Sequence, residues 1–453
     1  MRIPRPSPLL RCRPAALAFA LAAALPAPAR AAEDAAAATG QAAQTSVVRN
    51  ESPFQLDVSG YGELLFAFHN YGLNQNREGG AQRDARLVFD STRFVTELEG
   101  KMPWGFEFGA EVEFEHGGTG AEMELAYEEF GEFEQEISKG GEVLLEELYL
   151  RKRFGEHLSL SAGRFYVAVG TLNRGHSPVD YLAAERPESE TTVIPAVWHE
   201  MGLQLRAQFE HWRLTGQLIN GLDSTGFGSQ NWIAGGHQTR FEMVRATDLA
   251  GVGRVDWLPA KDVEIGVSAY YGGTSRNRPK ADLVKECDDN DPDEVAPCGY
   301  VEAPLLLLDF HTKFRVAGLR GTALFLWGHL KNAEAVSQRN NRLSNALEVP
   351  RTPVAEEAIA TWAELGYDVA PLLGIHEAHS LEPFVRFDYY DTMFEVPAGT
   401  FDNPRFERKV LTAGLAYTVA DSVVVKLDGV HRWFGSSELR PETSVRLGGG
   451  FVF

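Results

Sequence analysis

The sequence predicts an all-β fold, a transmembrane up-and-down antiparallel β-barrel of about 16 strands with long extracellular loops and short periplasmic turns. Three observations predict this fold class. Strand-like segments with alternating apolar and polar residues recur to the last residue. Short links between these segments alternate with long ones. Outside the N-terminus, no run approaches the roughly 20 apolar residues that a spanning helix requires.

The segment from Trp104 to Glu115, WGFEFGAEVEFE, shows the alternation most clearly. Side chains on a strand point to alternate faces, so one face of this strand is apolar and aromatic and the other is acidic. The acidic face carries Glu107, Glu111, Glu113 and Glu115. These carboxylates could attract cations in a channel, or they could form a solvated wall balanced by neighbouring arginines. Alone, the segment also fits a surface strand of a soluble sheet.

The length of the strands favours a membrane barrel over a soluble sheet. The segments are longer than the roughly 5–6 residues of soluble strands and match the roughly 9–11 that a tilted strand needs to cross the apolar layer. The predicted strands are 56–69, 87–100, 104–116, 143–154, 157–167, 199–209, 211–221, 248–258, 262–272, 303–315, 318–330, 356–369, 379–391, 409–419, 422–434 and 442–453.

The connections alternate in length, as expected when tight turns lie on one side of a membrane and long loops on the other. The predicted long connections are 70–86, 117–142, 168–198, 222–247, 273–302, 331–355, 392–408 and 435–441. The acidic connection 117–142 is predicted to be a solvated mouth segment, with binding of divalent ions that also bridge lipopolysaccharide as the alternative.

The first 54 residues are predicted to lie outside the barrel, which would span 55–453. Residues 1–31 have the basic start, the apolar Ala15–Leu25 stretch and the small residues of a signal peptide. Residues 32–54 are small, polar and aperiodic, as in a flexible lead-in. The signal holds five arginines and no acid, so its removal moves the formal charge from −20 to about −25. Such a charge excludes nucleic acid as a partner.

Aromatic residues near the predicted strand ends are typical of interfacial girdles, although core aromatics of a soluble sheet would give the same sequence pattern. They are Trp104, Tyr149, Trp198, Trp212, Trp257, Tyr271, Trp327, Trp433 and Phe434. The last strand ends on Phe453, which resembles the end of bacterial outer-membrane barrels and predicts that location.

Several stretches resemble the phosphate-selective porin O and P family of outer-membrane porins, most strongly over residues 55–275. They are SGYGELLFAF (59–68), RFVTELEGKMPWGFEFGAEVEFEHG (93–117), LLEELYLRKRFGEHLSLSAGRFYVAVGTLNRGHSP (144–178), ERPESETTVIPAVWHEMGLQL (185–205) and LINGLDSTGF (218–227). The resemblance implies a sixteen-stranded barrel, a homotrimer, and passive diffusion of small solutes through a water-filled channel.

The resemblance does not extend to phosphate selectivity. The arginine ladder and lysine cluster associated with phosphate-selective members cannot be aligned residue by residue. Inward-parity positions of both signs are predicted to line the pore instead. They are Arg93, Glu107, Glu111, Glu113, Arg151, Arg206, Arg254, Lys313, Arg315 and Arg386.

The long connection 168–198 is predicted to fold into the lumen and constrict it, because the corresponding loop does so in relatives of the family. A sixteen-stranded barrel is wide enough to leave an aqueous channel, so something usually narrows such barrels. The alternative is a surface loop that never enters the lumen. The candidate constriction residues are Arg174, His176, Asp180, Glu185 and Arg186. Charges of both signs at a constriction would select solutes by charge and size.

The sequence contains few signs of disulfide, metal or catalytic chemistry. Cys287 and Cys298 are predicted to form a disulfide, and the acids between them could instead bind calcium. No HExxH, paired CxxC or GxSxG motif is present, so neither an enzyme nor a cofactor or metal site is predicted. The predicted function is a porin for small charged solutes such as phosphate or other ions. The alternative is a surface receptor or structural barrel whose acidic loops bind a partner, and a soluble periplasmic β-protein is a third.

Overall fold

The structure is a computed structural model that describes residues 54–73, 83–117, 124–126, 134–136, 142–238, 244–278, 283–285, 298–343, 351–375 and 378–453. The predicted signal peptide 1–31 and the lead-in up to residue 53 lie outside the described residues. So do most of connection 117–142 and Cys287.

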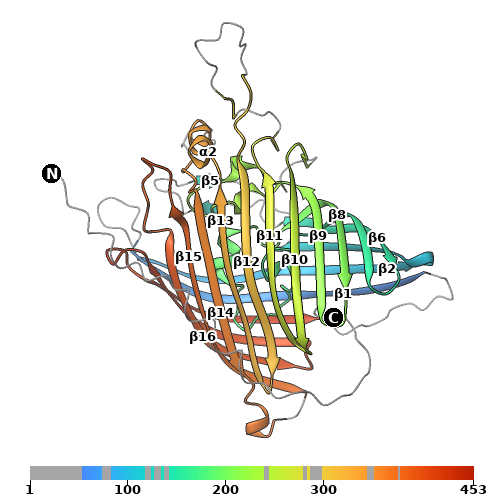
Figure 1. Ribbon diagram of the computed structural model, residues 1–453. Helices are drawn as coiled ribbons and strands as arrows, with labels where there is room; N and C mark the ends of the chain where they lie inside the picture. The colour runs from blue at the N-terminus through green and yellow to red at the C-terminus, as the bar shows by residue number, and fades with distance from the viewer. Residues whose placement is uncertain are drawn as a thin grey trace. The chain divides into compact units, whose positions relative to one another are not determined.

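Sixteen strands close into one antiparallel barrel, which confirms the predicted fold class (Figure 1). The barrel strands are β1 (Gln55–Leu73), β2 (Arg83–Met102), β3 (Phe106–Glu115), β6 (Glu142–Phe154), β7 (Leu158–Tyr166), β8 (His199–Gln208), β9 (Trp212–Asn220), β10 (Leu249–Ala260), β11 (Val263–Gly273), β12 (Pro304–Val316), β13 (Leu319–Leu330), β14 (Glu357–Tyr367), β15 (His379–Glu395), β16 (Glu407–Val419), β17 (Val423–Phe434) and β18 (Glu442–Val452).

Smaller elements lie in the connections. The short strands β4 (Glu124–Ala126) and β5 (Glu134–Glu136) pair with each other. Two helices, α1 (Glu188–Val193) and α2 (Ala333–Asn340), belong to long connections. In the described part of the chain, no helix is both long and apolar enough to cross a membrane.

The first and last strands close the barrel. Tyr61 of β1 is paired with Val452 of β18, and Phe453 exchanges backbone hydrogen bonds of 2.9 and 3.0 Å with Gly60. Each barrel strand is therefore paired on both sides. Closure matters because an unpaired edge in hydrocarbon would leave backbone groups without hydrogen bonds, at several kcal/mol each.

The short connections join neighbouring strands by tight turns. Ala317–Gly318 forms a two-residue hairpin in which both residues have positive φ, as such turns require to match the twist of the strands. The three-residue turns 103–105 and 420–422 also contain positive φ, at Trp104–Gly105 and Ala420–Asp421. The connection from β14 to β15 is longer and includes a short 3₁₀ turn, Pro371–Leu373. The long connections all leave the opposite end of the barrel, as predicted.

Side-chain direction follows the predicted parity. In β12, Leu308 and Phe310 are 43% and 45% exposed on the outer face, whereas Asp309 and His311 are only 4% and 2% exposed on the inner face. The outer face is therefore the apolar surface that lipid can cover. Most of the predicted girdle aromatics lie on this face, but Tyr149, Trp198 and Phe434 do not, because parity points them inward. Tyr149 and Trp198 are buried inside the barrel, and Phe434 is paired with Arg408, whose guanidinium lies 5.7 Å from its ring centroid.

Candidate functional site

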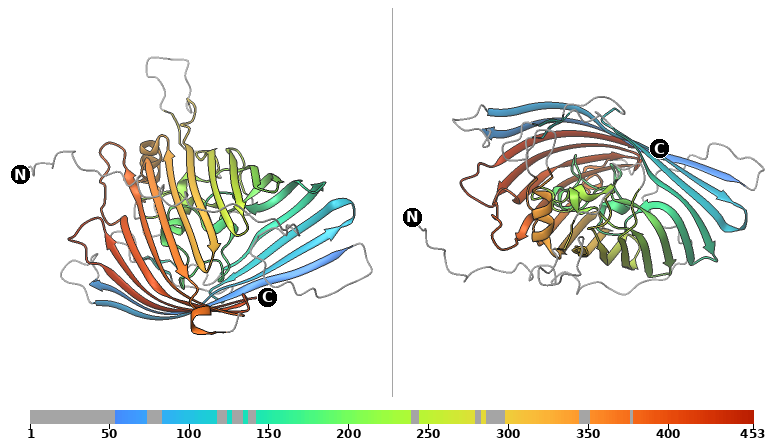
Figure 2. Two further views of the ribbon diagram at one scale, coloured as in Figure 1. Left: turned by 60° about the horizontal axis from the view of Figure 1, so that its bottom comes forward. Right: turned by 90° about the horizontal axis from the view of Figure 1, so that it is seen from above.

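The connection 167–198, which follows β7, lies inside the barrel; in Figure 2, green ribbon segments lie within the ring of strands. On one side of the lumen, Arg93 of β2 donates a hydrogen bond of 2.8 Å to the carbonyl of His176. On another side, Glu364 of β14 accepts one of 2.8 Å from the backbone N–H of Leu182. Because β2 and β14 are well separated around the barrel, this connection, hereafter the lumen loop, crosses the lumen.

Glu190 holds the two ends of the lumen loop together. It lies in α1, and its carboxylate accepts hydrogen bonds from the backbone N–H and the hydroxyl of Thr171, at 2.7 and 2.6 Å. The same carboxylate accepts from the indole N–H of Trp362 on β14, at 2.9 Å. A buried carboxylate satisfied by several donors fixes a segment strongly, because a charge left unpaired there would be costly.

The structure brings most of the candidate constriction residues against the wall. Arg174 lies 2.6 Å from Asp256 of β10, and Asp180 lies 3.0 Å from Lys313 of β12. Glu185 forms an ion pair with Arg446 of β18. These side chains bind the lumen loop in place, so their charges are largely compensated.

Arg186 differs from the other candidates. Its side chain is half-buried, and within the described residues its guanidinium makes no hydrogen bond or ion pair. Only its carbonyl is engaged, accepting a hydrogen bond of 3.3 Å from Arg386. Among the charged candidates it is therefore the one held in no ion pair within the described residues, although its charge acts at longer range on Glu63 and Glu113.

Two acidic groups of the lumen loop, Glu188 and Asp180, are held ionised by neighbouring cations. Burial by itself would raise the pKa of Glu188, but Arg432 at 2.5 Å and Arg408 at 3.6 Å lower that pKa to about 2. Burial opposes ionisation of Asp180 too, and Lys313 and the Ser177 hydroxyl outweigh it and lower the pKa of Asp180. The loop is thus bound to the wall by full charges at neutral pH.

The predicted pore-lining residues all come from inward positions, but their surroundings differ. Arg93, Glu111, Glu113, Arg254 and Arg386 are buried against the lumen loop, whereas Glu107, Arg151, Arg206, Lys313 and Arg315 lie nearer the short-turn end and are more exposed. Water can reach the second group more easily.

One group on the wall, the His311 cluster, is rich in arginine. It consists of Asp256, Glu264 and His311 together with Arg174, Arg213 and Arg254. Asp256 lies 2.6 Å from Arg174 and 2.7 Å from Arg254, and Glu264 lies 3.0 Å from both Arg213 and Arg254. His311 contacts carboxylates through both ring nitrogens, so both nitrogens donate. Every acid in this cluster has a cationic partner.

A second group, the His176 cluster, is rich in acid. It consists of Glu111, Glu113, Glu146, His176 and Arg93. The His176 ring lies between Tyr61 and Tyr166, with ring centroids 5.9 and 5.2 Å away. Burial, together with the Arg93 guanidinium, lowers the pKa of His176 to about 4. The imidazole is therefore neutral at pH 7.

Glu146 is the functional residue that sequence reasoning missed. Simple alternation places Glu147 inside and Glu146 outside. A β-bulge intervenes, because Glu111 is paired with Glu147 and the next residue, Val112, with Leu145. The extra residue turns Glu146 inward, where it is 2% exposed. No local sequence signal marks this bulge.

The inner face is not polar throughout, which the sequence did not predict. At the end with the long connections, inward residues such as Leu305 and Leu307 of β12 pack with loop residues. Trp198, Phe227 and Trp232 from these loops are at most 1% exposed. This apolar cluster fills part of the barrel on that side. Alternation alone cannot predict this apolar cluster, because parity determines which way a side chain points and not whether an inward side chain is polar or apolar.

Cys298 is disulfide-bonded, and its predicted partner Cys287 lies outside the described residues. The calcium alternative for the acids near Cys287 concerns side chains that also lie outside the described part. Both remain predictions.

Comparisons with known proteins agree with the fold. No protein-family model matches the sequence. An uncharacterized protein of Aquifex aeolicus is 22% identical over 380 residues, covering 83% of this chain and 75% of that protein. The outer-membrane channel DcaP of Acinetobacter baumannii superposes with a TM-score of 0.53 at 11% identity, covering 90% of this chain and 100% of that one. A loop-deletion mutant of OmpT, an outer-membrane protein of Vibrio cholerae, gives 0.50 at 8% identity, covering 89% and 100%.

Closed topology, apolar outer face and structural neighbours together define the class. The chain is a bacterial outer-membrane β-barrel with a porin-like fold. The phosphate-selective type that the sequence resembles is not confirmed by these comparisons, which at such low identity concern the fold.

Proposed function

We propose that this protein is a passive outer-membrane channel for small charged solutes, narrowed by the lumen loop. The observation that carries the proposal is the loop's path across the barrel interior, anchored to β2 on one side and to β14 on another. Nothing in this arrangement supplies energy, so solutes would move down their gradient.

The charges around the loop support selection by charge. The wall formed by β1, β2, β3 and β6 directs more carboxyl groups than cations inward, with Glu63, Glu97, Glu111, Glu113, Glu146 and Glu147 against Arg93 and Arg151. The wall from β13 to β18 carries both signs, because its inward cations Arg320, Arg386, Arg432 and Arg446 are paired with Glu382, Glu364, Asp388, Glu442 and Asp428. A solute in the channel would therefore meet an excess of acidic groups on one wall only, which discriminates between ions.

Anions, including phosphate, are solute candidates that the free Arg186 guanidinium would favour. The family resemblance of the sequence supports the same candidates, and it also supports a homotrimer. No catalytic role is part of this proposal.

Recording in planar lipid bilayers tests the channel. The purified protein is expected to give ohmic conductance steps, and neutralising Arg174 and Arg186 together is expected to shift ion preference toward cations, measured as a reversal potential in a salt gradient. Folded protein that never conducts would refute the channel, whereas an unchanged reversal potential would refute only the constriction.

The apolar cluster favours a second candidate function. Trp198, Phe227 and Trp232 occupy the barrel at the end with the long loops, and a barrel blocked there would suit a surface receptor or structural barrel. Absence of conductance, combined with specific binding of a partner to the intact barrel, would support this candidate.

A further inference from the structure

The His176 cluster contains polar atoms whose bonding capacity is unused. Glu111 Oε1, Glu113 Oε1 and His176 Nε2 are buried and have no hydrogen-bond partner among the residues that the structure describes. The three residues are 5%, 3% and 7% exposed. Leaving such atoms unpaired is expensive, and buried charges in proteins are normally paired or coordinate metal ions.

Cationic compensation in the cluster is incomplete. Arg93 is the one guanidinium within ion-pair distance among the described residues, and it lies 2.9 Å from Glu63 and 3.7 Å from Glu113. Glu111 has the His176 ring 3.8 Å away, and Glu146 accepts a hydrogen bond of 2.8 Å from the Tyr166 hydroxyl and is also hydrogen-bonded to the Glu113 carboxyl group. The cluster therefore holds more carboxyl groups than cations.

His176 is oriented as a metal ligand would be. Its Nδ1 lies 3.0 Å from the carbonyl oxygen of Leu172, which can only accept, so Nδ1 carries the proton. The lone pair is then on Nε2, which faces Glu111. A backbone carbonyl that fixes one ring nitrogen and leaves the other free is the common arrangement around metal-binding histidines.

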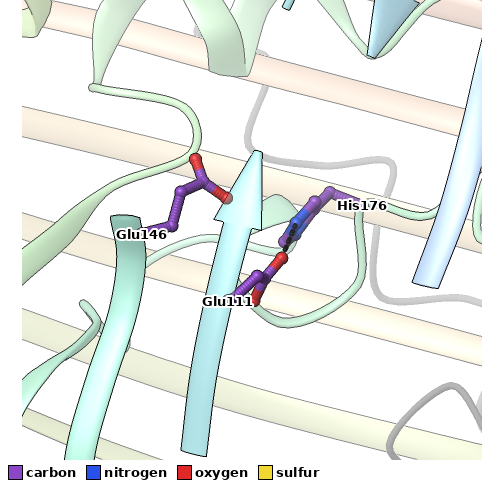
Figure 3. A group of neighbouring side chains, drawn as sticks. All are labelled: Glu111, Glu146 and His176. Atoms are coloured by element: carbon purple, nitrogen blue, oxygen red, sulfur yellow. Dashed lines mark ion pairs between the residues drawn. The ribbon is translucent and has the colours of Figure 1, made fainter. Parts of the chain in front are cut away.

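Two glutamates complete the set. One ligand atom from each of Glu111, Glu146 and His176 lies within 4.8 Å of the others. Figure 3 shows the three side chains gathered between β3, β6 and the lumen loop. Ligands about 2 Å from a tetrahedral Zn²⁺ lie about 3.3 Å apart, so small side-chain rotations suffice to close the site. The Tyr166 hydroxyl orients Glu146 by donating to its Oε2.

We propose that Glu111, Glu146 and His176 bind a divalent transition-metal cation, with Zn²⁺ as the representative ion. One imidazole and two carboxylates suit such a cation, whereas calcium and magnesium prefer oxygen ligands alone. The ion ties the lumen loop, through His176, to the wall strands β3 and β6. The proposal does not depend on the channel function.

The His311 cluster provides an internal contrast. Asp256, Glu264 and His311 are as closely grouped as the proposed ligands. There, however, arginine guanidinium groups occupy the carboxylates, and both nitrogens of His311 already donate. We assign no metal to that group.

Zinc titration of the full-length, detergent-folded protein tests the proposal after chelator treatment. Wild type is expected to bind one tight equivalent of Zn²⁺, measured by calorimetry and by metal content. Glu111→Gln and His176→Gln are each expected to weaken binding by at least about 100-fold, since loss of even an outer-shell partner costs about 10- to 100-fold. Glu146→Gln serves as a further ligand variant should one of these fail to fold.

His311→Gln is the matched control, because it alters the other histidine–carboxylate group, and it is expected to retain the tight equivalent. Zn²⁺ should also raise the thermal midpoint of wild type and of His311→Gln, and not that of His176→Gln. No tight binding by the folded wild type would overturn the proposal. So would folded Glu111→Gln and His176→Gln variants with unchanged affinity, which would mean that zinc binds elsewhere.

Discussion

The His311 and His176 clusters are built from the same kinds of group and differ in how their charge is balanced. Each combines one imidazole with several carboxylates of the wall strands; the His311 imidazole lies on the wall strand β12, whereas the His176 imidazole belongs to the lumen loop. Around Asp256 and Glu264, three arginines neutralise the acids. Around Glu111, Arg93 is shared with Glu63 and Glu113, and polar atoms remain without partners.

The comparison shows that an acidic face on a strand does not define its own role. Neighbouring strands and the loop decide whether the carboxylates become a closed ion-pair network or a site able to accept a cation. The lumen loop contributes Arg174 to one cluster and His176 to the other, only two residues apart. A short stretch of loop therefore makes two chemically different contacts with the wall.

The largest expected effect comes from breaking the balanced cluster. Asp256→Asn would leave Arg174 and Arg254 buried without their shared carboxylate, and we expect it to lower the free energy of unfolding by about 3–5 kcal/mol. Denaturant unfolding of the folded barrel in lipid vesicles would measure the loss. Asp262→Asn, at an exposed turn with positive φ, is the control and should change stability by less than about 0.5 kcal/mol. Equal stability of the two variants would contradict the assigned balance.

A substitution in the acid-rich His176 cluster should have the opposite effect on the free energy of unfolding. In metal-free protein, Glu111→Gln replaces a buried carboxyl group that has no cationic partner among the described residues, so we expect no loss of stability and a gain of up to about 1 kcal/mol in the free energy of unfolding. Glu107→Gln on the same strand is the comparison, because Glu107 pairs with Arg151 and Arg153. That substitution should be slightly destabilising. Destabilisation by both changes would mean that Glu111 is compensated after all.

Ion selectivity distinguishes the paired arginine from the free one. Arg186→Gln is expected to change the anion-to-cation permeability ratio a few-fold, because a charge that is not held in an ion pair in a narrow passage acts directly on ions. Arg174→Gln should change it less, since Asp256 already offsets that charge. Reversal potentials of the two single variants in a salt gradient give the comparison. A larger shift for Arg174→Gln would reverse the assignment.

Lowering the pH within the ordinary range is expected to have the smallest effect on the stability of the barrel. The pKa of Glu188 is about 2, lowered from 4.5. Its stabilising contribution is therefore complete above pH 4.5 and is lost as the pH falls through 2. Arg432→Gln should move that loss toward higher pH, because it removes the cation that does most to lower the pKa. Unfolding midpoints from pH 7 to 2 would measure it, and identical acid profiles would rule out this anchoring role.

Much of the barrel could be predicted from the sequence, because outward residues must be apolar and tilted strands need a minimum length. The predicted strand 199–209 and the observed β8, His199–Gln208, differ by one residue. The direction of Glu111 also followed from parity. Glu146 could not be predicted, because the bulge that turns it inward arises from pairing with β3.

The inner contacts were less accessible to sequence reasoning. Nothing in the local pattern indicates that Glu190 binds Trp362, 172 residues away. The pattern also does not indicate that Arg174 has an ion-pair partner whereas Arg186 has none among the described residues. Trp198 looked like an interfacial aromatic because it stands at a strand end, although its parity points inward, where residues of several loops pack around it. Long-range contacts of this kind depend on which strands face each other across the barrel.

The central claim, that the lumen loop lies in the path of solutes, is tested most directly by single-channel recording of an Arg186→Cys variant during exposure to charged, membrane-impermeant thiol reagents. Modification at position 186 is expected to change the conductance in steps, with anionic and cationic reagents shifting the ion preference in opposite directions. Labelling of the thiol with no change in either conductance or selectivity would show that the loop lies outside the conducting path.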